Sequence, residues 1–122
     1  MVELDQFRYR ISGYDKPMAQ IKNSLDLDNK QKRIEELEAD MESPGFWDNP
    51  DKAREISQEA TQLKDAVEGY KHLVSEIEDA KLMLDMALEE EDTSMEAELT
   101  TLVDGIREEV EKREVLLLLG GE

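Results

Sequence analysis

The stretch Ser43-Pro44-Gly45-Phe46-Trp47-Asp48-Asn49-Pro50 decides the fold, because it separates two long segments of helix-forming, acidic sequence. It holds two of the three prolines of the chain and its only tryptophan. A helix does not run easily through Pro44-Gly45, since proline lacks an N–H group and restricts the residue before it. We therefore predict a structural corner, made by Pro44, Phe46, Trp47 and Pro50, whose two aromatic rings plug one end of a helical bundle.

The segment that follows the corner carries the longest apolar pattern of the chain. Pro50 fits the first helical position, where its missing N–H costs nothing. The only polar interruption is Lys81, and a shift of the apolar stripe by one position, to Ala80, continues it. We predict one helix over about 50–89, about 60 Å long at 1.5 Å per residue, and hence an elongated molecule. The stripe comprises Ala53, Ile56, Ala60, Leu63, Val67, Tyr70, Val74, Ile77, Leu84 and Leu88.

Three further helices are expected from apolar residues at steps of three and four. The first covers about 3–23, and Gly13 and Pro17 predict a kink near 13–17. The second covers 28–42, and the last, antiparallel to the long helix, covers 94–117. Their stripes are Leu4, Phe7, Ile11, Tyr14, Met18, Ile21 and Leu25; then Leu27, Ile34, Leu37 and Met41; then Leu99, Leu102, Ile106, Val110 and Leu117.

Residues that favour helix N-caps precede three of these segments. Asp26 or Asp28 suits the second helix, and Asp48 or Asn49 suits the long one. Thr93-Ser94-Met95-Glu96 has the Ser/Thr-x-x-Glu form of a capping box. The predicted class is therefore all-α, an elongated antiparallel helical bundle or coiled coil with about four helices.

Length and composition agree with one helical domain. The chain has 122 residues, 39% charged and only 5% aromatic, which is typical of long helices. The regular apolar spacing argues against disorder. We expect a single domain over 1–119. The apolar run Val115–Leu119 is exposed unless something covers it, so we expect the chain to be a fragment, with 120–122 as a truncated linker to missing domains.

The net charge of −17 is distributed unevenly. Residues 1–33 hold seven basic and five acidic side chains, and the remainder holds eight basic and 27 acidic. Acidic surface repels phosphates, so direct DNA binding is not expected, and any RNA contact is expected from the first third. The candidate partner contacts are Arg8, Arg10, Lys16 and Lys22 in that third, and Glu89, Glu90, Glu91 and Asp92 in an acidic turn.

The residues offer little for catalysis or metal binding. There is no cysteine, and a single histidine, His72, lacks the Glu-x-x-His spacing of a di-iron site. Asp26-x-Asp28 starts like a calcium loop but is not continued as one. We expect no catalytic residue, no cofactor and no metal. With no signal-peptide pattern and no apolar run long enough to span a bilayer, we expect a soluble, cytoplasmic protein without a membrane partner.

Several of these residues recur together in a known family. Ser24-Leu25-Asp26-Leu27, the corner Pro44-x-Phe46-Trp47-Asp48, and the closing Glu114–Leu119 resemble the N-terminal region of bacterial peptide chain release factor 2. The resemblance covers about residues 4–119. The Phe-Trp corner at its offset from Ser-Leu-Asp-Leu is the specific part, because acidic heptads occur in many coiled coils.

The resemblance implies a role in translation termination at the stop codons UGA and UAA. The family's codon-reading Ser-Pro-Phe and catalytic Gly-Gly-Gln motifs do not occur here, so the chain would be a non-catalytic helical domain. In the family this domain reaches toward the stalk base of the large ribosomal subunit, near the GTPase-associated centre. The implied partners are the ribosome, the GTPase that recycles release factors, and the missing C-terminal domains of the same protein.

Two other functions remain open at this point. A stand-alone acidic coiled-coil scaffold could self-associate along Val67, Tyr70, Val74 and Ile77. An enzyme that uses metal or carboxylates is the less favoured. The acidic turn and the Pro44–Pro50 corner lie at opposite ends of the long helix, and the sequence does not decide which of them contacts a partner.

Overall fold

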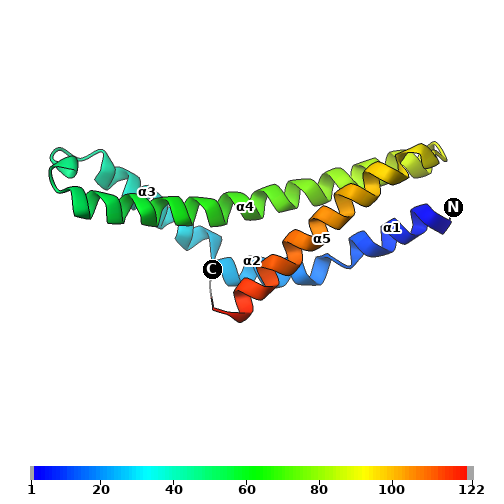
Figure 1. Ribbon diagram of the computed structural model, residues 1–122, viewed down its shortest axis with the longest axis horizontal. Coiled ribbons are helices and arrows are strands. Elements are labelled where there is room, and N and C mark those ends of the chain that lie inside the picture. Colours follow the sequence, from blue (N-terminus) through cyan, green and yellow to red (C-terminus); the bar gives the residue numbers. More distant parts are fainter. Residues whose placement is uncertain (1, 121–122) are drawn as a thin grey trace. The chain divides into compact units, whose positions relative to one another are not determined.

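The computed structural model describes the backbone of residues 2–120 and the side chains of residues 4–120. In this part of the chain every regular element is helical, which confirms the predicted all-α class (Figure 1). The long helix occupies the range expected for it, whereas the elongated shape stays a prediction. The elements are α1 (Val2–Ser12), α2 (Asp15–Leu25), α3 (Leu27–Met41), the 3-10 turn η1 (Phe46–Asp48), α4 (Pro50–Glu89), the 3-10 turn η2 (Thr93–Met95) and α5 (Glu96–Leu118).

The chain divides into two compact units. Unit 1 comprises Met1–Ser24 and Lys71–Glu122, and unit 2 comprises Leu25–Tyr70. Helix α4 contributes its first part to unit 2 and its last part to unit 1. The single domain over 1–119 stays a prediction, and residues 121 and 122 of the expected linker lie outside the described residues.

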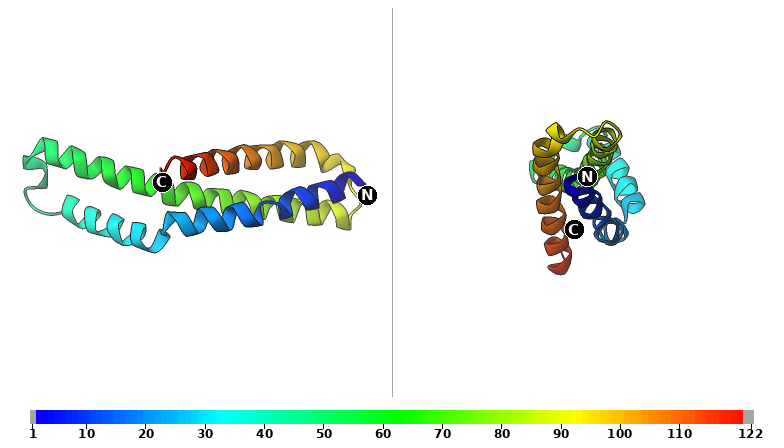
Figure 2. Two further views of the ribbon diagram at one scale, coloured as in Figure 1. Left: turned by 90° about the horizontal axis from the view of Figure 1, so that it is seen from below. Right: turned by 90° about the vertical axis from the view of Figure 1, so that its right-hand side faces the viewer.

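Unit 1 is built on the apolar stripes that the sequence predicts. Helix α5 runs back along the last part of α4, and α1 contacts α5 (Figure 2). Lys81 is exposed while Ala80 is fully buried, as the shifted stripe requires. On α4 Leu73 and Ala87 are buried, whereas the predicted Val74 and Leu88 are only half-buried. On α5 the buried position is Val103, whereas Leu102 is only half-buried, so these parts of the predicted stripes are wrong. The buried apolar residues are Leu4, Phe7, Ile11, Tyr14, Ile21, Leu73, Ile77, Ala80, Leu84, Ala87, Leu99, Val103, Ile106 and Val110.

A turn at Gly13 and Tyr14 divides the first predicted helix into α1 and α2. The Gly13 N–H donates to the carbonyl oxygens of Tyr9 and Arg10, both at 3.2 Å. A side chain at position 13 would lie 3.2 Å from the Arg10 carbonyl oxygen, which is a tight approach. Pro17 is the third residue of α2, where its missing N–H removes no helical hydrogen bond. The five α-helices of the described chain, against about four expected, follow from this break.

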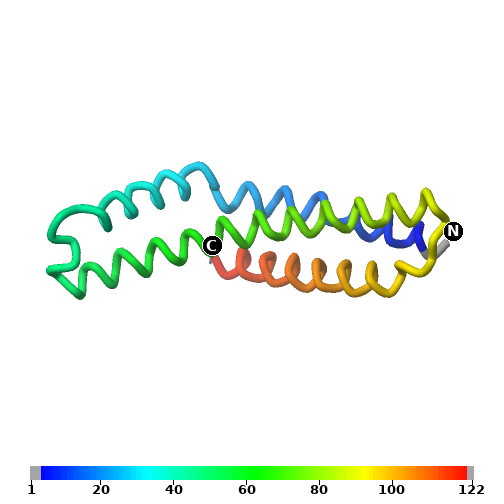
Figure 3. Tube along the Cα trace, turned by 90° about the horizontal axis from the view of Figure 1, so that it is seen from above, coloured from blue at the N-terminus to red at the C-terminus, as the bar shows by residue number. Residues whose placement is uncertain are grey.

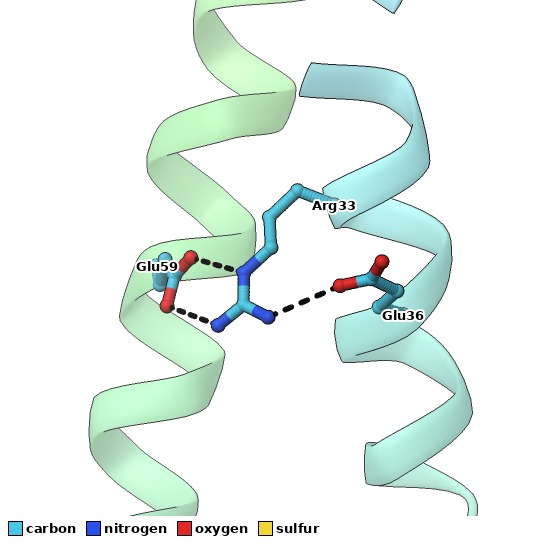
Figure 4. A network of polar contacts seen from close by, with 3 residues as sticks. All are labelled: Arg33, Glu36 and Glu59. Carbon is cyan, nitrogen blue, oxygen red and sulfur yellow. Dashed lines mark hydrogen bonds and ion pairs between the residues drawn. The ribbon is translucent and has the colours of Figure 1, made fainter. Parts of the chain in front are cut away.

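Unit 2 pairs α3 with the first part of α4, which run antiparallel on either side of the corner (Figure 3). The buried residues here include only three from α4, namely Ala53, Ala60 and Val67, and Ile34 and Leu37 from α3. The helices are also joined by ion pairs. The Arg33 guanidinium donates through Nε and Nη2 to both carboxylate oxygens of Glu59, at 2.7 and 3.1 Å, and through Nη1 to Glu36 at 3.3 Å (Figure 4). Lys64 pairs with Glu38 at 2.8 Å.

The helix caps agree with the sequence only in part. The Lys52 N–H donates to Asn49 Oδ1 at 3.3 Å, so Asn49 caps α4 as expected. Asp26 stands at the N-cap of α3, but its backbone is left-handed, with φ 50°, and its side chain accepts no N–H of the helix. Its carboxylate accepts instead from the Asn29 amide at 2.6 Å. The expected capping box at Thr93 is replaced by a cap from Asp92, the residue before it.

Candidate functional site

The histidine and carboxylate side chains of the described residues are spread along the helices. None of them form a group of three or more His, Asp or Glu side chains that could hold a metal ion. His72 is exposed and lies 3.3 Å from Glu76 one turn further along α4. Among the helices that the structure describes, none is long and apolar enough to cross a membrane.

Arg10, a predicted partner contact, is engaged inside unit 1. Its Nη2 donates to Asp104 Oδ1 on α5 at 2.6 Å, and this hydrogen bond holds the pKa of Asp104 below its usual value. One turn along, the buried Tyr14 hydroxyl donates to the Val103 carbonyl oxygen at 2.8 Å, and burial raises the pKa of Tyr14. These contacts fasten the α1–α2 segment to α5, so Arg10 serves the fold.

The other three basic candidates are exposed. Arg8 lies 3.6 Å from Asp5, one turn before it on α1. Lys16 and Lys22, both on α2, form no ion pair among the residues that the structure describes. Of the basic residues proposed from the sequence, these two lysines are the ones left to meet an anionic partner.

The acidic turn after α4 is ordered by one of its own carboxylates. Asp92 accepts from the Ser94 hydroxyl at 2.5 Å and from the Ser94 N–H at 2.9 Å, and these hydrogen bonds lower the pKa of Asp92. Glu91 is left-handed, with φ 52°, which reverses the chain. Asp92 thus has a structural role, while Glu89, Glu90 and Glu91 stay exposed.

The corner is placed where the sequence predicts it, but its tryptophan does not plug the bundle. Trp47 is 65% exposed, Phe46 is half-buried, and Pro44 and Pro50 are exposed. The two rings meet edge to face, with centroids 4.7 Å apart and planes at 89°. The prediction of a packed plug is wrong for Trp47, because the ring is held beside Phe46 rather than beneath other side chains.

One further exposed aromatic residue was missed from the sequence. Tyr9 is 81% exposed and lies between two hollows of unit 1. One, of about 480 Å³, is lined by Asp5, Gln6, Tyr9 and Arg10. The other, of about 330 Å³, is lined by Tyr9, Arg10, Gly13, Tyr14 and Arg107. The available signal was that Tyr9 falls outside the apolar stripe of its helix.

The apolar positions suggested for self-association are largely covered within a single chain. Val67 and Ile77 are only 5% and 7% exposed, and Tyr70 and Val74 are half-buried. A dimer along this line would require the helices of one chain to separate first. This disfavours the coiled-coil scaffold.

The fold is therefore an all-helical one with charged and aromatic side chains exposed on its surface. The comparisons with known proteins give the family. A model of the PCRF domain matches residues 30–121, and the chain belongs to this family. It is similar to peptide chain release factor 2 of Staphylococcus aureus (strain COL), 38% identical over 120 residues, and to those of Staphylococcus saprophyticus and Staphylococcus haemolyticus, each 36% identical over 120 residues. Each match covers 98% of this chain and 32% of the relative, so the chain spans about a third of their length.

Proposed function

We propose that this chain is a non-catalytic helical domain of a translation termination factor, and that it positions the factor on the ribosome. The observation that carries the proposal is the match to peptide chain release factor 2 over 98% of the chain. The full-length factor would act in the cytoplasm at the stop codons UGA and UAA. This domain would contact the stalk base of the large subunit and, through its exposed surfaces, the recycling GTPase and the remaining domains of the same protein.

The exposed charges support a binding role. Lys16 and Lys22 are available for a phosphate, whereas Arg10 is held by Asp104. Glu89, Glu90 and Glu91 are available for a basic protein surface. The acidic majority of the chain favours ribosomal protein over ribosomal RNA as the main contact, because like charges repel.

Co-sedimentation of the purified chain with ribosomes tests the positioning role. We expect weak binding to intact ribosomes and to large subunits, and loss of binding to large subunits stripped of their stalk-base protein. Lys16→Glu combined with Lys22→Glu should weaken binding at low salt more than Lys112→Glu, a matched exposed lysine on α5. Binding that is indifferent to the stalk-base protein would contradict the proposed location.

A peptide-release assay on termination complexes tests the non-catalytic role. The chain alone should release no peptide, while an intact release factor in the same assay should. Efficient release by the chain alone would show that the proposal is wrong.

A further inference from the structure

The corner holds its tryptophan in a fixed, outward position. Gly45 is left-handed, with φ 80°, and starts the turn η1. The turn is closed by hydrogen bonds from the Phe46 N–H to the Ser43 carbonyl oxygen at 3.2 Å and from the Asp48 N–H to the Gly45 carbonyl oxygen at 3.1 Å. Phe46 packs edge to face with Trp47, yet Trp47 stays 65% exposed. A large aromatic ring is thus presented to a partner with its backbone already ordered.

The surroundings of this ring are acidic. Asp40, Glu42 and Asp48 are exposed and form no ion pair among the described residues. Beside the corner lies a hollow of about 380 Å³, lined by Asp40, Ser43, Pro44, Gly45, Phe46, Asn49, Lys52 and Ile56. Lys52 is the single cation among these eight lining residues. The corner therefore combines an exposed indole with exposed carboxylates that form no ion pair among the described residues.

We propose that the corner binds an arginine-bearing segment of a basic partner protein. A guanidinium stacks on the Trp47 ring, since arginine both stacks on aromatic faces and donates to carboxylates. Asp40, Glu42 and Asp48 supply the countercharge. The inference rests on the proposed function in one respect, that a ribosomal protein supplies this segment.

The negative charge of the corner favours a basic protein segment over RNA and over a second copy of the chain. The phosphates of RNA would meet the exposed carboxylates of Asp40, Glu42 and Asp48, which form no ion pair among the described residues, and like charges repel. A second copy of the chain would bring another net charge of −17 to the same acidic surface. A basic protein segment is attracted by the same field.

Nuclear magnetic resonance titration of the whole chain tests the proposal directly. The probe is a short synthetic peptide of alternating arginine and glycine, compared with a lysine–glycine peptide of the same charge and with polyuridylate. We expect saturable shifts of the backbone amides of residues 43, 45–49, 51 and 52 with the arginine peptide, and weaker binding of the lysine peptide. Larger shifts of the same amides with polyuridylate would overturn the proposal in favour of RNA.

Trp47→Ala tests the role of the ring. We expect it to weaken binding of the arginine peptide on the order of tenfold, as loss of a cation–π contact implies. Tyr9→Ala, which removes the exposed tyrosine of unit 1, is the matched control and should leave binding unchanged. Equal binding by the wild type and Trp47→Ala, or equal shifts at Glu89–Glu91, would mean that charge alone attracts the peptide and would overturn the proposal.

A second variant keeps the test valid if Trp47→Ala fails to fold, which circular dichroism would reveal. Asp40→Asn combined with Glu42→Gln changes only exposed charges, and should weaken binding of the arginine peptide severalfold at low salt. Unchanged binding by this variant would overturn the proposal. Ribosome co-sedimentation tests the proposed function separately from this inference. If the wild-type chain sediments with ribosomes but does not bind the arginine peptide, the proposed function stands and the inference is wrong. If the wild-type chain binds the arginine peptide specifically but does not sediment with ribosomes, the inference stands and the proposed function is wrong.

Discussion

Unit 1 and unit 2 are both made of helices packed side by side, but their buried side chains differ. Unit 1 buries large aliphatic residues on α1, α2, α4 and α5, and adds the buried hydrogen bond from Tyr14 to Val103. In unit 2 the buried positions of α4 are two alanines and one valine, and the polar links between helices are exposed ion pairs such as Arg33–Glu59. Exposed ion pairs contribute little to stability, so unit 2 should open more easily than unit 1.

The largest effect is expected from a matched pair of core substitutions, Leu99→Ala in unit 1 and Leu37→Ala in unit 2. Both side chains are buried, at 0% and 1% exposure. We expect Leu99→Ala to cost about 3–5 kcal/mol and Leu37→Ala about 2–3 kcal/mol, since large-to-small core changes span about 2–5 kcal/mol and the α4 side chains buried in unit 2 are small. Urea unfolding followed by circular dichroism measures both, with amide exchange locating the opening. A larger cost for Leu37→Ala would remove the proposed difference between the units.

A smaller effect is expected from Tyr14→Phe, which removes the buried hydroxyl and leaves the Val103 carbonyl oxygen without that donor. The loss should be about 0.5–1.5 kcal/mol, the usual net contribution of one hydrogen bond, because the Val103 carbonyl lies inside α5 and keeps its helical partner. Arg33→Met in unit 2 should cost less, and sodium chloride should reduce its effect, since the ion pair is exposed. The comparison fails if the two substitutions cost the same and respond equally to salt.

The helices could be predicted from the sequence because their signals are local. The apolar spacing of Leu4 to Leu25 and the proline at position 50 depend only on nearby residues, and the structure agrees with both. The exposure of Trp47 could not be predicted, because it depends on whether any other element covers the corner. A large aromatic residue at a helix end suggests burial on average, and this chain is an exception.

The candidate site was predicted less well because its contacts are distant in sequence. Arg10 and Asp104 are 94 residues apart, and no local spacing shows that they meet. The sequence therefore offered Arg10 as a partner contact although the fold already uses it. Asp92 was offered for the same role, and only the backbone geometry at Glu91 and Ser94 shows that it caps a turn.

The smallest effect, the pH dependence of stability, distinguishes the ion pairs of the two units. Hydrogen bonds from arginine lower the pKa of Glu59 in unit 2 and of Asp104 in unit 1 below the ordinary values of these carboxyl groups. A carboxylate whose pKa is lower in the folded state stabilises the fold above its unfolded pKa and loses this contribution as the pH falls through the folded value. The contribution of Glu59 to unit 2 should therefore begin to be lost at a higher pH than the contribution of Asp104 to unit 1, because the unfolded pKa of a glutamate is the higher of the two.

Urea unfolding at a series of pH values, with amide exchange to separate the units, measures this order. Glu59→Gln should reduce the loss of stability of unit 2 at acid pH, and Asp104→Asn should do the same for unit 1. Asp79→Asn, which changes an exposed carboxylate of α4, is the charge-matched control and should leave the pH dependence of stability of both units unchanged. Loss of stability in unit 1 at the higher pH would mean that the ion pair between Arg10 and Asp104 is weaker than the one between Arg33 and Glu59. The buried contacts of Tyr14 would then have to hold α1 and α2 against α5.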